Sequence, residues 1–319
     1  MSHQIETMAH VGAAPWHRLG NALPAHQPLS VWAEKAGMDW EILDAPVLYR
    51  VNASDAADVH TFEDQRVLFR SDTKAALSVV GGRYQVVQPR AVLEFYRDLS
   101  EVAGYELETA GVLRGGRKFW ALARMGKESV LQGSDVVRGY ILLATSCDGT
   151  LATTATPTSV RVVCNNTLTM ALNNATGAVK VPHSTTFDAQ TVKAQLGIAV
   201  SGWDEFMYRM KKLSERKVRD KEVDTFIRKV LGVSQVAPDQ AVTNERAMKR
   251  VLSLFEAQGH GAELGAARGT AWGLLNSVTE YVDHERRART QDFRLDSAWF
   301  GQGAAVKGRA LEEALQLIA

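Results

Sequence analysis

A turn in the middle of the chain carries side chains that could bind single-stranded nucleic acid. Arg114, Arg117 and Lys118 surround a Gly-Gly turn and are followed by Phe119 and Trp120. A flexible turn with three cations and neighbouring aromatic rings can follow a phosphate backbone while a ring stacks on a base. We therefore predict that the three cations contact phosphate and that Trp120 stacks. A solvated turn with Trp120 in the hydrophobic core is the alternative.

A second basic cluster lies between Arg209 and Lys229. It contains nine Lys and Arg residues and four Asp and Glu residues, which is the largest local excess of positive charge in the chain. Because phosphates bind where such cations gather, we predict that Lys211 and Lys212 contact nucleic acid. In the alternative, the segment is an exposed helix whose cations pair with acids one turn away. A third, smaller basic cluster runs from Glu285 to Arg289.

Arg161 is unusual because it lies inside an apolar run, between Val160 and Val162. A charge in such a place is rarely left unpaired in a folded protein. It could pair with Asp148 or another acid, or it could face a polar groove. In a groove it would contact phosphate, and we include it among the predicted DNA-binding residues. The residues Asn165-Asn166-Thr167 that follow could bind a ligand, but we favour helix capping.

One set of acids and a histidine has the chemistry of metal ligands. Glu280 and His284 are one helical turn apart, with Asp283 beside His284, and carboxylates and imidazoles both bind zinc. The sequence has no H-E-x-x-H motif and no second histidine nearby, so we predict no metal site. It also lacks the G-x-S-x-G motif and the spacing of a P-loop. We predict no catalytic residue and no cofactor; a metal-dependent nucleic-acid enzyme that uses these three residues is a less favoured alternative.

Composition limits the classes of protein to consider. The chain has 319 residues, a formal net charge of +1 and 45% hydrophobic residues. Any surface for nucleic acid must therefore be a local patch. Two cysteines, Cys147 and Cys164, do not suggest a disulfide framework. No apolar run approaches the length of a membrane-spanning helix, and the start carries no signal-peptide pattern. We predict a cytoplasmic protein without membrane contact.

Periodicity and turn signals place the elements that must position these side chains. Cys147-Asp148-Gly149 lies between two β-type runs, and Asp-Gly is a strong hairpin signal because primed turns need positive φ. The second strand should lead into a buried helix within 159–172, although Val160–Cys164 fits a strand as well as a helix. The remaining predictions for this half are strands at 40–51, 66–70, 77–80, 84–87, 105–113 and 118–125, a loop at 52–63, a short helix with Ser30 as its N-cap, and a helix from Pro89 to 101.

After Asp188, apolar residues recur at helical spacing to the end of the chain. Sequential hairpins before that point favour an antiparallel sheet. We therefore predict an α+β fold, a mostly antiparallel sheet with helices on one face, followed by an all-helical C-terminal part. The predicted domains are an N-terminal arm (1–30), an α+β core domain (31–187) and a helical C-terminal region (188–319).

Several motifs occur together in this chain. They are Met8-Ala9-His10 with Pro15-Trp16-His17-Arg18-Leu19-Gly20, Gly82-Arg83-Tyr84-Gln85-Val86-Val87-Gln88, Arg161-Val162-Val163-Cys164-Asn165-Asn166-Thr167-Leu168, Trp272-Gly273-Leu274-Leu275-Asn276 with Thr279-Glu280-Tyr281-Val282-Asp283-His284, and Trp299-Phe300-Gly301. With this set the chain resembles the phage/plasmid-like protein family that carries a domain of unknown function, number 932 of that series. The resemblance covers nearly the whole chain and implies a phage, prophage or plasmid origin and a bacterial host cytoplasm. It supplies no catalytic residues.

The predicted order of helix, β-meander and helix also resembles the core of single-strand annealing proteins. In those proteins a basic groove beside a β-hairpin holds DNA, and the subunits form rings. Together with the basic clusters, this resemblance predicts a non-catalytic homo-oligomer that binds single-stranded DNA in replication or recombination. The alternative is a protein-interaction module that modulates a host defence or replication protein.

Overall fold

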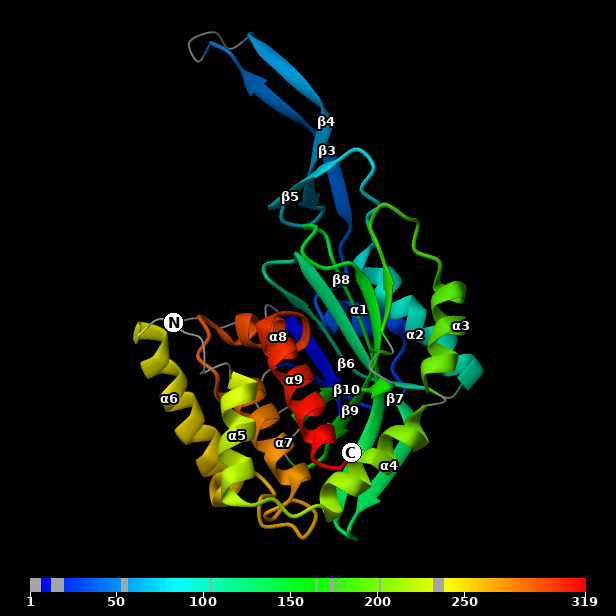
Figure 1. The fold of residues 1–319 in the computed structure, drawn as a ribbon. Coiled ribbons are helices and arrows are strands. Elements are labelled where there is room, and N and C mark those ends of the chain that lie inside the picture. Colours follow the sequence, from blue (N-terminus) through cyan, green and yellow to red (C-terminus); the bar gives the residue numbers. More distant parts are fainter. Residues whose placement is uncertain are drawn as a thin grey trace. The chain divides into compact units, whose positions relative to one another are not determined.

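A computed structural model gives the fold of the protein (Figure 1). It describes residues 7–12, 20–52, 57–103, 105–163, 166–172, 175–176, 178–200, 202–231 and 238–319. The chain forms two compact units, each made of several segments. Unit 1 comprises Met1–Arg124, Ile141–Thr156 and Ala178–Leu196, and unit 2 comprises Met125–Tyr140, Pro157–Gly177 and Gly197–Ala319. The predicted domains are continuous ranges, and their boundaries stay predictions.

Eight of the described strands form one mostly antiparallel sheet, in which the path β10-β9-β8-β7-β6-β1-β2 is joined by β13 on β9. These strands are β1 (Thr7–Val11), β2 (Asn21–Leu23), β6 (Glu106–Leu113), β7 (Lys118–Leu131), β8 (Asp135–Ser146), β9 (Thr153–Arg161), β10 (Asn166–Thr169) and β13 (Val179–Val181). β1 and β2 pair in parallel. The division between the two units passes through β7, β8 and β9. A separate short hairpin joins β11 (Ala171–Leu172) to β12 (Ala175–Thr176).

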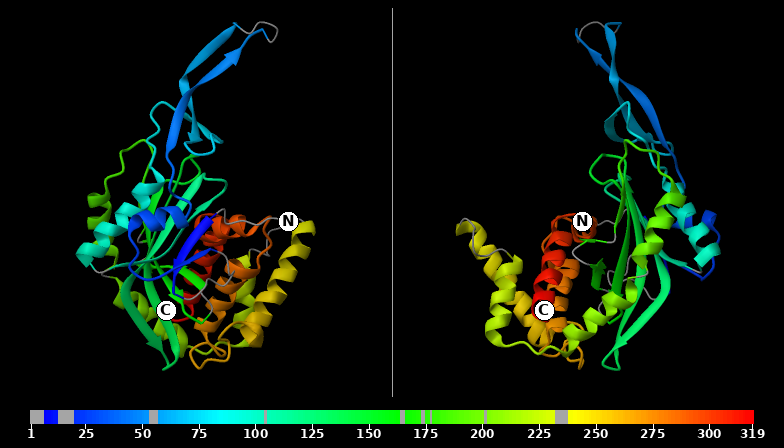
Figure 2. Two further views of the ribbon diagram at one scale, coloured as in Figure 1. Left: turned by 180° about the vertical axis from the view of Figure 1, so that it is seen from behind. Right: turned by 45° about the vertical axis from the view of Figure 1, so that its right-hand side comes forward.

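Unit 1 contains a second, three-stranded sheet with the order β3-β4-β5. Its strands are β3 (Ile42–Arg50), β4 (Val59–Arg70) and β5 (Ala76–Gly81). β5 pairs with β4 only between Gln65 and Phe69. β3 and β4 continue past this point and pair only with each other, as a ribbon that extends beyond β5 (Figures 1 and 2).

Two helices of unit 1, α1 (Leu29–Lys35) and α2 (Pro89–Ala103), pack on each other, and α2 packs on β6. Tyr96 attaches α2 to the strands because its buried hydroxyl lies 2.9 Å from the carbonyl oxygens of Ala121 and Ile141. The same hydroxyl accepts a hydrogen bond of 2.7 Å from the Leu143 amide. Burial raises the pKa of Tyr96 well above its usual value, so the group stays a neutral donor and acceptor.

Unit 2 is mainly helical. Its helices are α4 (Trp203–Glu215), α5 (Asp220–Leu231), α6 (Pro238–Ser253), α7 (Ala271–Glu280), α8 (Gln291–Phe300) and α9 (Gln302–Gln316), while α3 (Ala189–Val200) belongs partly to each unit. α9 packs against α5, α7 and α8, which Figure 2 shows from two sides. Two π-helical turns extend α6 and α7, namely η2 (Leu254–Gln258) and η3 (Tyr281–Glu285). Among the described residues no helix is long and apolar enough to span a bilayer.

The α+β class, the mostly antiparallel sheet and the helical C-terminal part are confirmed. The predicted helix within 159–172 is wrong, because β9 continues to Arg161 and β10 folds back on it from Asn166 to Thr169. Of Val160–Cys164, Val160 and Arg161 are therefore strand and Val162-Val163 a turn, while Cys164 and Asn165 lie outside the described residues. Asn166 is paired in the sheet and does not cap a helix.

Three smaller predictions also differ from the structure. The loop predicted at 52–63 ends early because β4 begins at Val59, opposite Arg50. No strand forms over 84–87, where Arg66 donates to the Tyr84 carbonyl. Helix α1 follows Pro28 as its N-cap and already includes Ser30. Within the predicted N-terminal arm, residues 7–11 and 21–23 form short strands of the large sheet, whereas residues 1–6 and 13–19 lie outside the described part of the chain.

Replacing Tyr96 by Phe tests the attachment of α2. The substitution keeps the ring but leaves the Leu143 amide and two carbonyl groups without the hydroxyl, so we expect a loss of about 1–3 kcal/mol in unfolding free energy. Urea unfolding followed by circular dichroism measures it. Tyr49→Phe, at an exposed tyrosine of β3, is the control and should change stability by under about 0.5 kcal/mol. Equal effects of the two substitutions would contradict the role of the Tyr96 hydroxyl.

Candidate functional site

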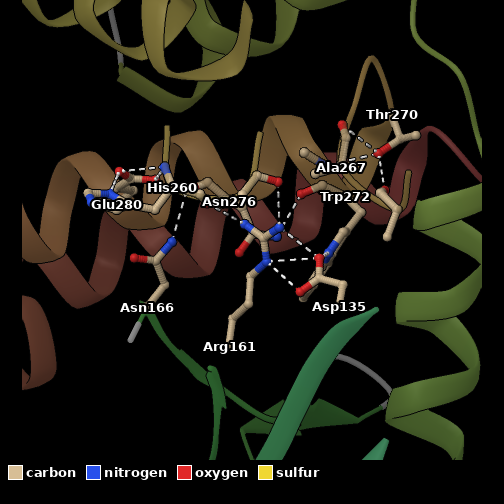
Figure 3. Close-up of polar contacts among 12 residues, drawn as sticks. Asp135, Arg161, Asn166, His260, Ala267, Thr270, Trp272, Asn276 and Glu280 are labelled. Atoms are coloured by element: carbon tan, nitrogen blue, oxygen red, sulfur yellow. Dashed lines mark hydrogen bonds and ion pairs between the residues drawn. The ribbon is translucent and has the colours of Figure 1, made fainter. Parts of the chain in front are cut away.

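Unit 2 contains a buried ion pair between the first residue of β8 and the last residue of β9 (Figure 3). Arg161 Nε lies 2.8 and 2.9 Å from the two carboxylate oxygens of Asp135, and Arg161 Nη2 lies 2.7 Å from Asp135 Oδ2. The Trp272 indole on α7 donates to the same Asp135 oxygen at 3.0 Å. Both charged side chains are almost fully buried. Removal from water is costly for each charge, and this geometry offsets the cost through several charge-assisted hydrogen bonds.

The same guanidinium holds the loop that follows η2. Arg161 Nη1 donates to the His260 carbonyl at 3.1 Å, and Nη2 donates to the Gly261 carbonyl at 2.9 Å. Gly261 has a φ of +71°, and a Cβ there would lie 2.8 Å from Val163 Cγ1. Only glycine fits this approach without strain. Arg161 therefore joins β9 to a loop about a hundred residues later in the chain.

His260 in this loop pairs with a buried carboxylate on α7. The His260 backbone amide donates to both oxygens of Glu280, at 3.1 and 3.0 Å, and His260 Nδ1 lies 2.6 Å from Glu280 Oε1. Glu280 is 3% exposed, whereas the imidazole is 71% exposed. The carboxylate favours the tautomer with hydrogen on Nδ1, which leaves Nε2 as an acceptor. The Nε2 atom of this ring can therefore accept a hydrogen bond.

A second buried ion pair connects β10, η3 and α9. Lys307 Nζ lies 2.6 Å from Asp283 Oδ1 and also donates to the carbonyl and hydroxyl oxygens of Thr167. The Thr167 amide donates to Asp283 Oδ2 at 2.8 Å. Beside it, Asn166 donates to the Asn276 carbonyl, and its Oδ1 lies 3.1 Å from His284 Nε2. We call the residues joined by these contacts the polar network. Its members are Asp135, Arg161, Asn166, Thr167, His260, Gly261, Trp272, Asn276, Glu280, Asp283, His284 and Lys307.

The three residues considered as metal ligands in the less favoured alternative are part of the polar network and are held by protein groups. Glu280 binds His260, Asp283 binds Thr167 and Lys307, and His284 contacts Asn166. The part of the chain that the structure describes contains no group of three or more His, Cys, Asp or Glu side chains arranged to hold a metal. Asp283 and His284 do lie on a π-helical turn, a feature that is frequent at functional sites. Here the turn serves to aim the two side chains at β10.

The Gly-Gly turn of unit 1 exposes only part of its predicted nucleic-acid surface. Arg114 has a φ of +61° and is half-buried, and Arg117 is exposed. Lys118 and Trp120 are buried, with Trp120 among the largest fully enclosed side chains of the core. A buried indole is closed to a base, so the structure favours the alternative in which Trp120 belongs to the hydrophobic core.

This turn packs against the turn at Cys147. The Cys147 amide donates to the Arg117 carbonyl at 2.9 Å, and its thiol lies 3.6 Å from the Gly116 carbonyl. Burial, with a further contribution from the Asp148 charge, raises the pKa of the Cys147 thiol to about 12. The thiol is therefore protonated at neutral pH and packs as a small buried hydrophobic group.

The second basic cluster is largely paired with acids. The pairs are Arg209–Glu205, Lys212–Glu215, Arg216–Glu222, Arg219–Glu222, Arg228–Asp224 and Lys229–Glu313. Glu222 has its pKa lowered to about 2, first by the Arg219 amide and then by the two arginine side chains. Lys211 and Lys212 are both exposed, and Lys212 lies 3.8 Å from its acid. Of the predicted phosphate contacts in unit 2, these two are accessible and Arg161 is not.

An aromatic residue that the sequence analysis did not select lies beside these lysines. Tyr208 on α4 is 57% exposed, and Lys212 Nζ lies 5.6 Å from the centre of its ring. Residues 208, 211 and 212 share one helix face because of their i, i+3 and i+4 spacing. That spacing is visible in the sequence. However, Tyr208 lies between the core residues Met207 and Met210 in the sequence, so it was not distinguished from the apolar side of the helix.

Comparison with protein families confirms the predicted resemblance. The model of the domain of unknown function DUF932 matches residues 76–299. The chain belongs to the DUF932 family. No curated protein and no solved structure matches the chain. The DUF932 match contains Asp135, Arg161, His260 and Glu280, whereas Lys307 lies beyond it. Three of the motifs that carried the predicted resemblance, beginning at Arg161, Trp272 and Thr279, meet in the polar network of this DUF932 protein.

A double-mutant cycle tests the buried ion pair. Arg161→Met leaves a buried carboxylate without its cation, and Asp135→Leu leaves a buried guanidinium, so each should lower the unfolding free energy by about 3–5 kcal/mol. The double variant should cost less than the sum, because the uncompensated charge is gone. Chemical unfolding of the four proteins gives the coupling energy.

Arg90→Met is the matched control for the cycle, since Arg90 forms an exposed pair with Glu94. It should cost under about 1 kcal/mol. If the Arg161 and Asp135 substitutions were additive, or as mild as the control, the pair would not hold this part of unit 2 together.

Proposed function

We propose that the chain is a non-catalytic single-stranded DNA-binding protein of a phage, prophage or plasmid, with a role in replication or recombination. The observation that carries the proposal is the exposed face of α4 formed by Tyr208, Lys211 and Lys212, which we call the α4 patch. Sequence-independent binding of single strands needs cations for phosphates and an aromatic ring for a base. The α4 patch supplies both within one and a half helical turns.

The chemistry of the α4 patch favours single strands over duplexes. A tyrosine ring can stack only on a base whose face is open, and in a duplex that face is covered by the neighbouring pairs. The formal net charge of +1 gives the chain no general attraction for duplex DNA. A short local patch should therefore act through stacking together with a few phosphate contacts.

The proposal modifies the set of contact residues. Lys211 and Lys212 are retained, and Tyr208 replaces Trp120 as the stacking ring. In unit 1, Arg117 and Arg114 at the Gly-Gly turn remain candidate phosphate contacts. The burial of Lys118 and Arg161 argues against a direct contact by either side chain.

The two other hypotheses have less support. A metal-dependent enzyme would need Glu280, Asp283 and His284, whose side chains already bind protein groups. An interaction module for a host defence or replication protein would dock through the outer faces of the C-terminal helices. On α4 and α5 these faces carry ion pairs such as Arg209–Glu205 and Arg228–Asp224, which gives no apolar docking surface there.

Fluorescence anisotropy with labelled oligonucleotides at several salt concentrations tests the proposal. The unmodified protein should bind single strands more tightly than duplexes, with affinity falling as salt rises. Replacing Lys211 and Lys212 together by Gln should reduce the slope of log affinity against log salt by about 1.4, because each lost phosphate contact removes about 0.7. Tyr208→Ala should weaken binding by about 1–3 kcal/mol with little change in slope, whereas Tyr208→Phe should bind nearly as the unmodified protein does.

The matched control is Arg90→Gln with Lys127→Gln, which removes two exposed cations far from α4 in the sequence. This variant should keep the salt slope of the unmodified protein. A control that weakens binding as much as the lysine pair would indicate a general charge effect. Absence of binding to single strands at low salt would refute the proposed function.

A further inference from the structure

The end of the ribbon formed by β3 and β4 has no covering layer among the described residues. We call residues 47–51 and 59–62 the distal ribbon. It begins at a bulge between Pro46 and Val47, and within it Val47 pairs with Phe62, Leu48 with Thr61, Tyr49 with His60, and Arg50 with Val59. β5 does not reach this far along β4. Figures 1 and 2 show the ribbon projecting past the three-stranded part of the sheet.

Both faces of the distal ribbon carry exposed apolar side chains, together with the polar residues Arg50, His60 and Thr61. Residues opposite each other in an antiparallel pair lie on the same face. One face therefore carries Val47, Tyr49 and Phe62, and the other carries Leu48 and Val59. The exposed fractions of Leu48, Tyr49, Val51, Val59 and Phe62 range from 41% to 74%. The stacked rings of Tyr49 and His60, 5.4 Å apart, cover each other only partly.

Such a ribbon needs a partner for physical reasons. A two-stranded hairpin alone is marginally stable in water, and natural proteins protect exposed strand edges with charges, prolines or covering elements. On β3 the bulge and Pro46 protect only the proximal side. From Val47 to Val51 the edge carries a single charge, Arg50. This segment therefore has the properties of a strand that pairs with another strand.

The sequence of this edge fits a second copy of itself. About a two-fold axis at Tyr49, antiparallel pairing places Val47 opposite Val51, Tyr49 opposite Tyr49, and Leu48 opposite Arg50. Each Arg50 meets an apolar side chain, and no like charges face each other. β-Branched and aromatic residues in opposite positions are favourable cross-strand pairs.

Antiparallel pairing of two β4 edges about a two-fold axis gives less favourable cross-strand pairs than pairing of two β3 edges. With the axis at Thr61, it would place Val59 opposite the Glu63 carboxylate and Phe62 opposite His60. The β3 edge is therefore the better self-complementary surface, as a closed two-fold dimer requires.

We propose that two copies of the chain associate through the β3 edges of their distal ribbons and form a continuous four-stranded antiparallel sheet. In this sheet Val47, Tyr49 and Val51 of both copies line one face. The distal ribbon lies outside residues 76–299, the part that matches the DUF932 model. The proposed dimer is independent of DNA binding by the α4 patch, because the two use different units of the chain.

Sedimentation velocity over the micromolar range tests the dimer. The unmodified protein should dimerise. Tyr49→Lys places two like charges opposite each other on the axis, so the dimer dissociation constant should rise by about tenfold or more. Val79→Lys is the matched control, because Val79 is an equally exposed valine on β5, and it should leave the dimer intact. Mixing Tyr49→Lys with Tyr49→Glu should restore dimers as heterodimers, which a merely misfolded variant would not do.

Disulfide trapping tests the register. Under mild oxidation Tyr49→Cys should form a covalent dimer, because the two Tyr49 positions face each other across the axis. Thr61→Cys, on the exposed β4 side of the same ribbon, should not exceed the cross-linking of the unmodified protein, which carries only its native cysteines. A monomeric unmodified protein, a dimer indifferent to Tyr49→Lys, or preferential trapping through Thr61→Cys would each overturn the proposal. The first of these outcomes would leave the ribbon to a different protein.

Discussion

The buried pair between Arg161 and Asp135 is the interaction on which the second unit depends most. Neither charge is stable alone in a dry interior, and each is held only because the other is present. The pair then recruits further groups, since the guanidinium has donors to spare for the His260 and Gly261 carbonyls and the carboxylate accepts from Trp272. One arginine thereby fixes the end of β9, the start of β8, the loop after η2 and the start of α7.

The same method of attachment recurs in unit 1 with neutral groups. The side-chain amide of Gln88 donates to the Ile42 carbonyl and accepts from the Ile42 amide, at 3.0 and 2.8 Å. These two hydrogen bonds replace those that a neighbouring strand would make to Ile42, the first residue of β3. The Tyr84 hydroxyl donates to the Ser146 carbonyl, and its ring stacks on His183. The motif from Gly82 to Gln88 therefore has a structural explanation, because its polar side chains complete the edges where regular pairing stops.

Apolar periodicity and turn residues were sufficient to predict the elements that are determined by their own local sequence. Apolar periodicity located the helical region after Asp188. The Gly-Gly turn located the hairpin of β6 and β7, and the Asp-Gly turn located the hairpin of β8 and β9. The wrong predictions occur where contacts with residues distant in the sequence determine the local structure. The segment from Ser159 to Leu172 fits a helix as well as strands, and β10 is selected because Thr167 and Asn166 bind partners on η3 and α7 more than a hundred residues away. The apolar neighbours of Arg161 left two alternatives open, an acidic partner or a polar groove in which it would contact phosphate. The structure pairs it with Asp135 and not with Asp148, and nothing local in the sequence distinguished Asp135 from the other acids.

Magnitudes decide which cations are available to a ligand. A charge-assisted hydrogen bond to phosphate contributes about 1.5–3 kcal/mol, whereas removing Arg161 from its buried carboxylate costs about 3–5 kcal/mol. Such an exchange is unfavourable, and the same reasoning applies to Lys307 with Asp283. An exposed pair such as Lys212 with Glu215 costs at most about 1 kcal/mol to break, so a phosphate can compete for that lysine. The buried cations therefore hold the fold. The proposed binding of nucleic acid relies on exposed cations such as Arg117 and the lysines of α4, where Tyr208 adds an exposed ring.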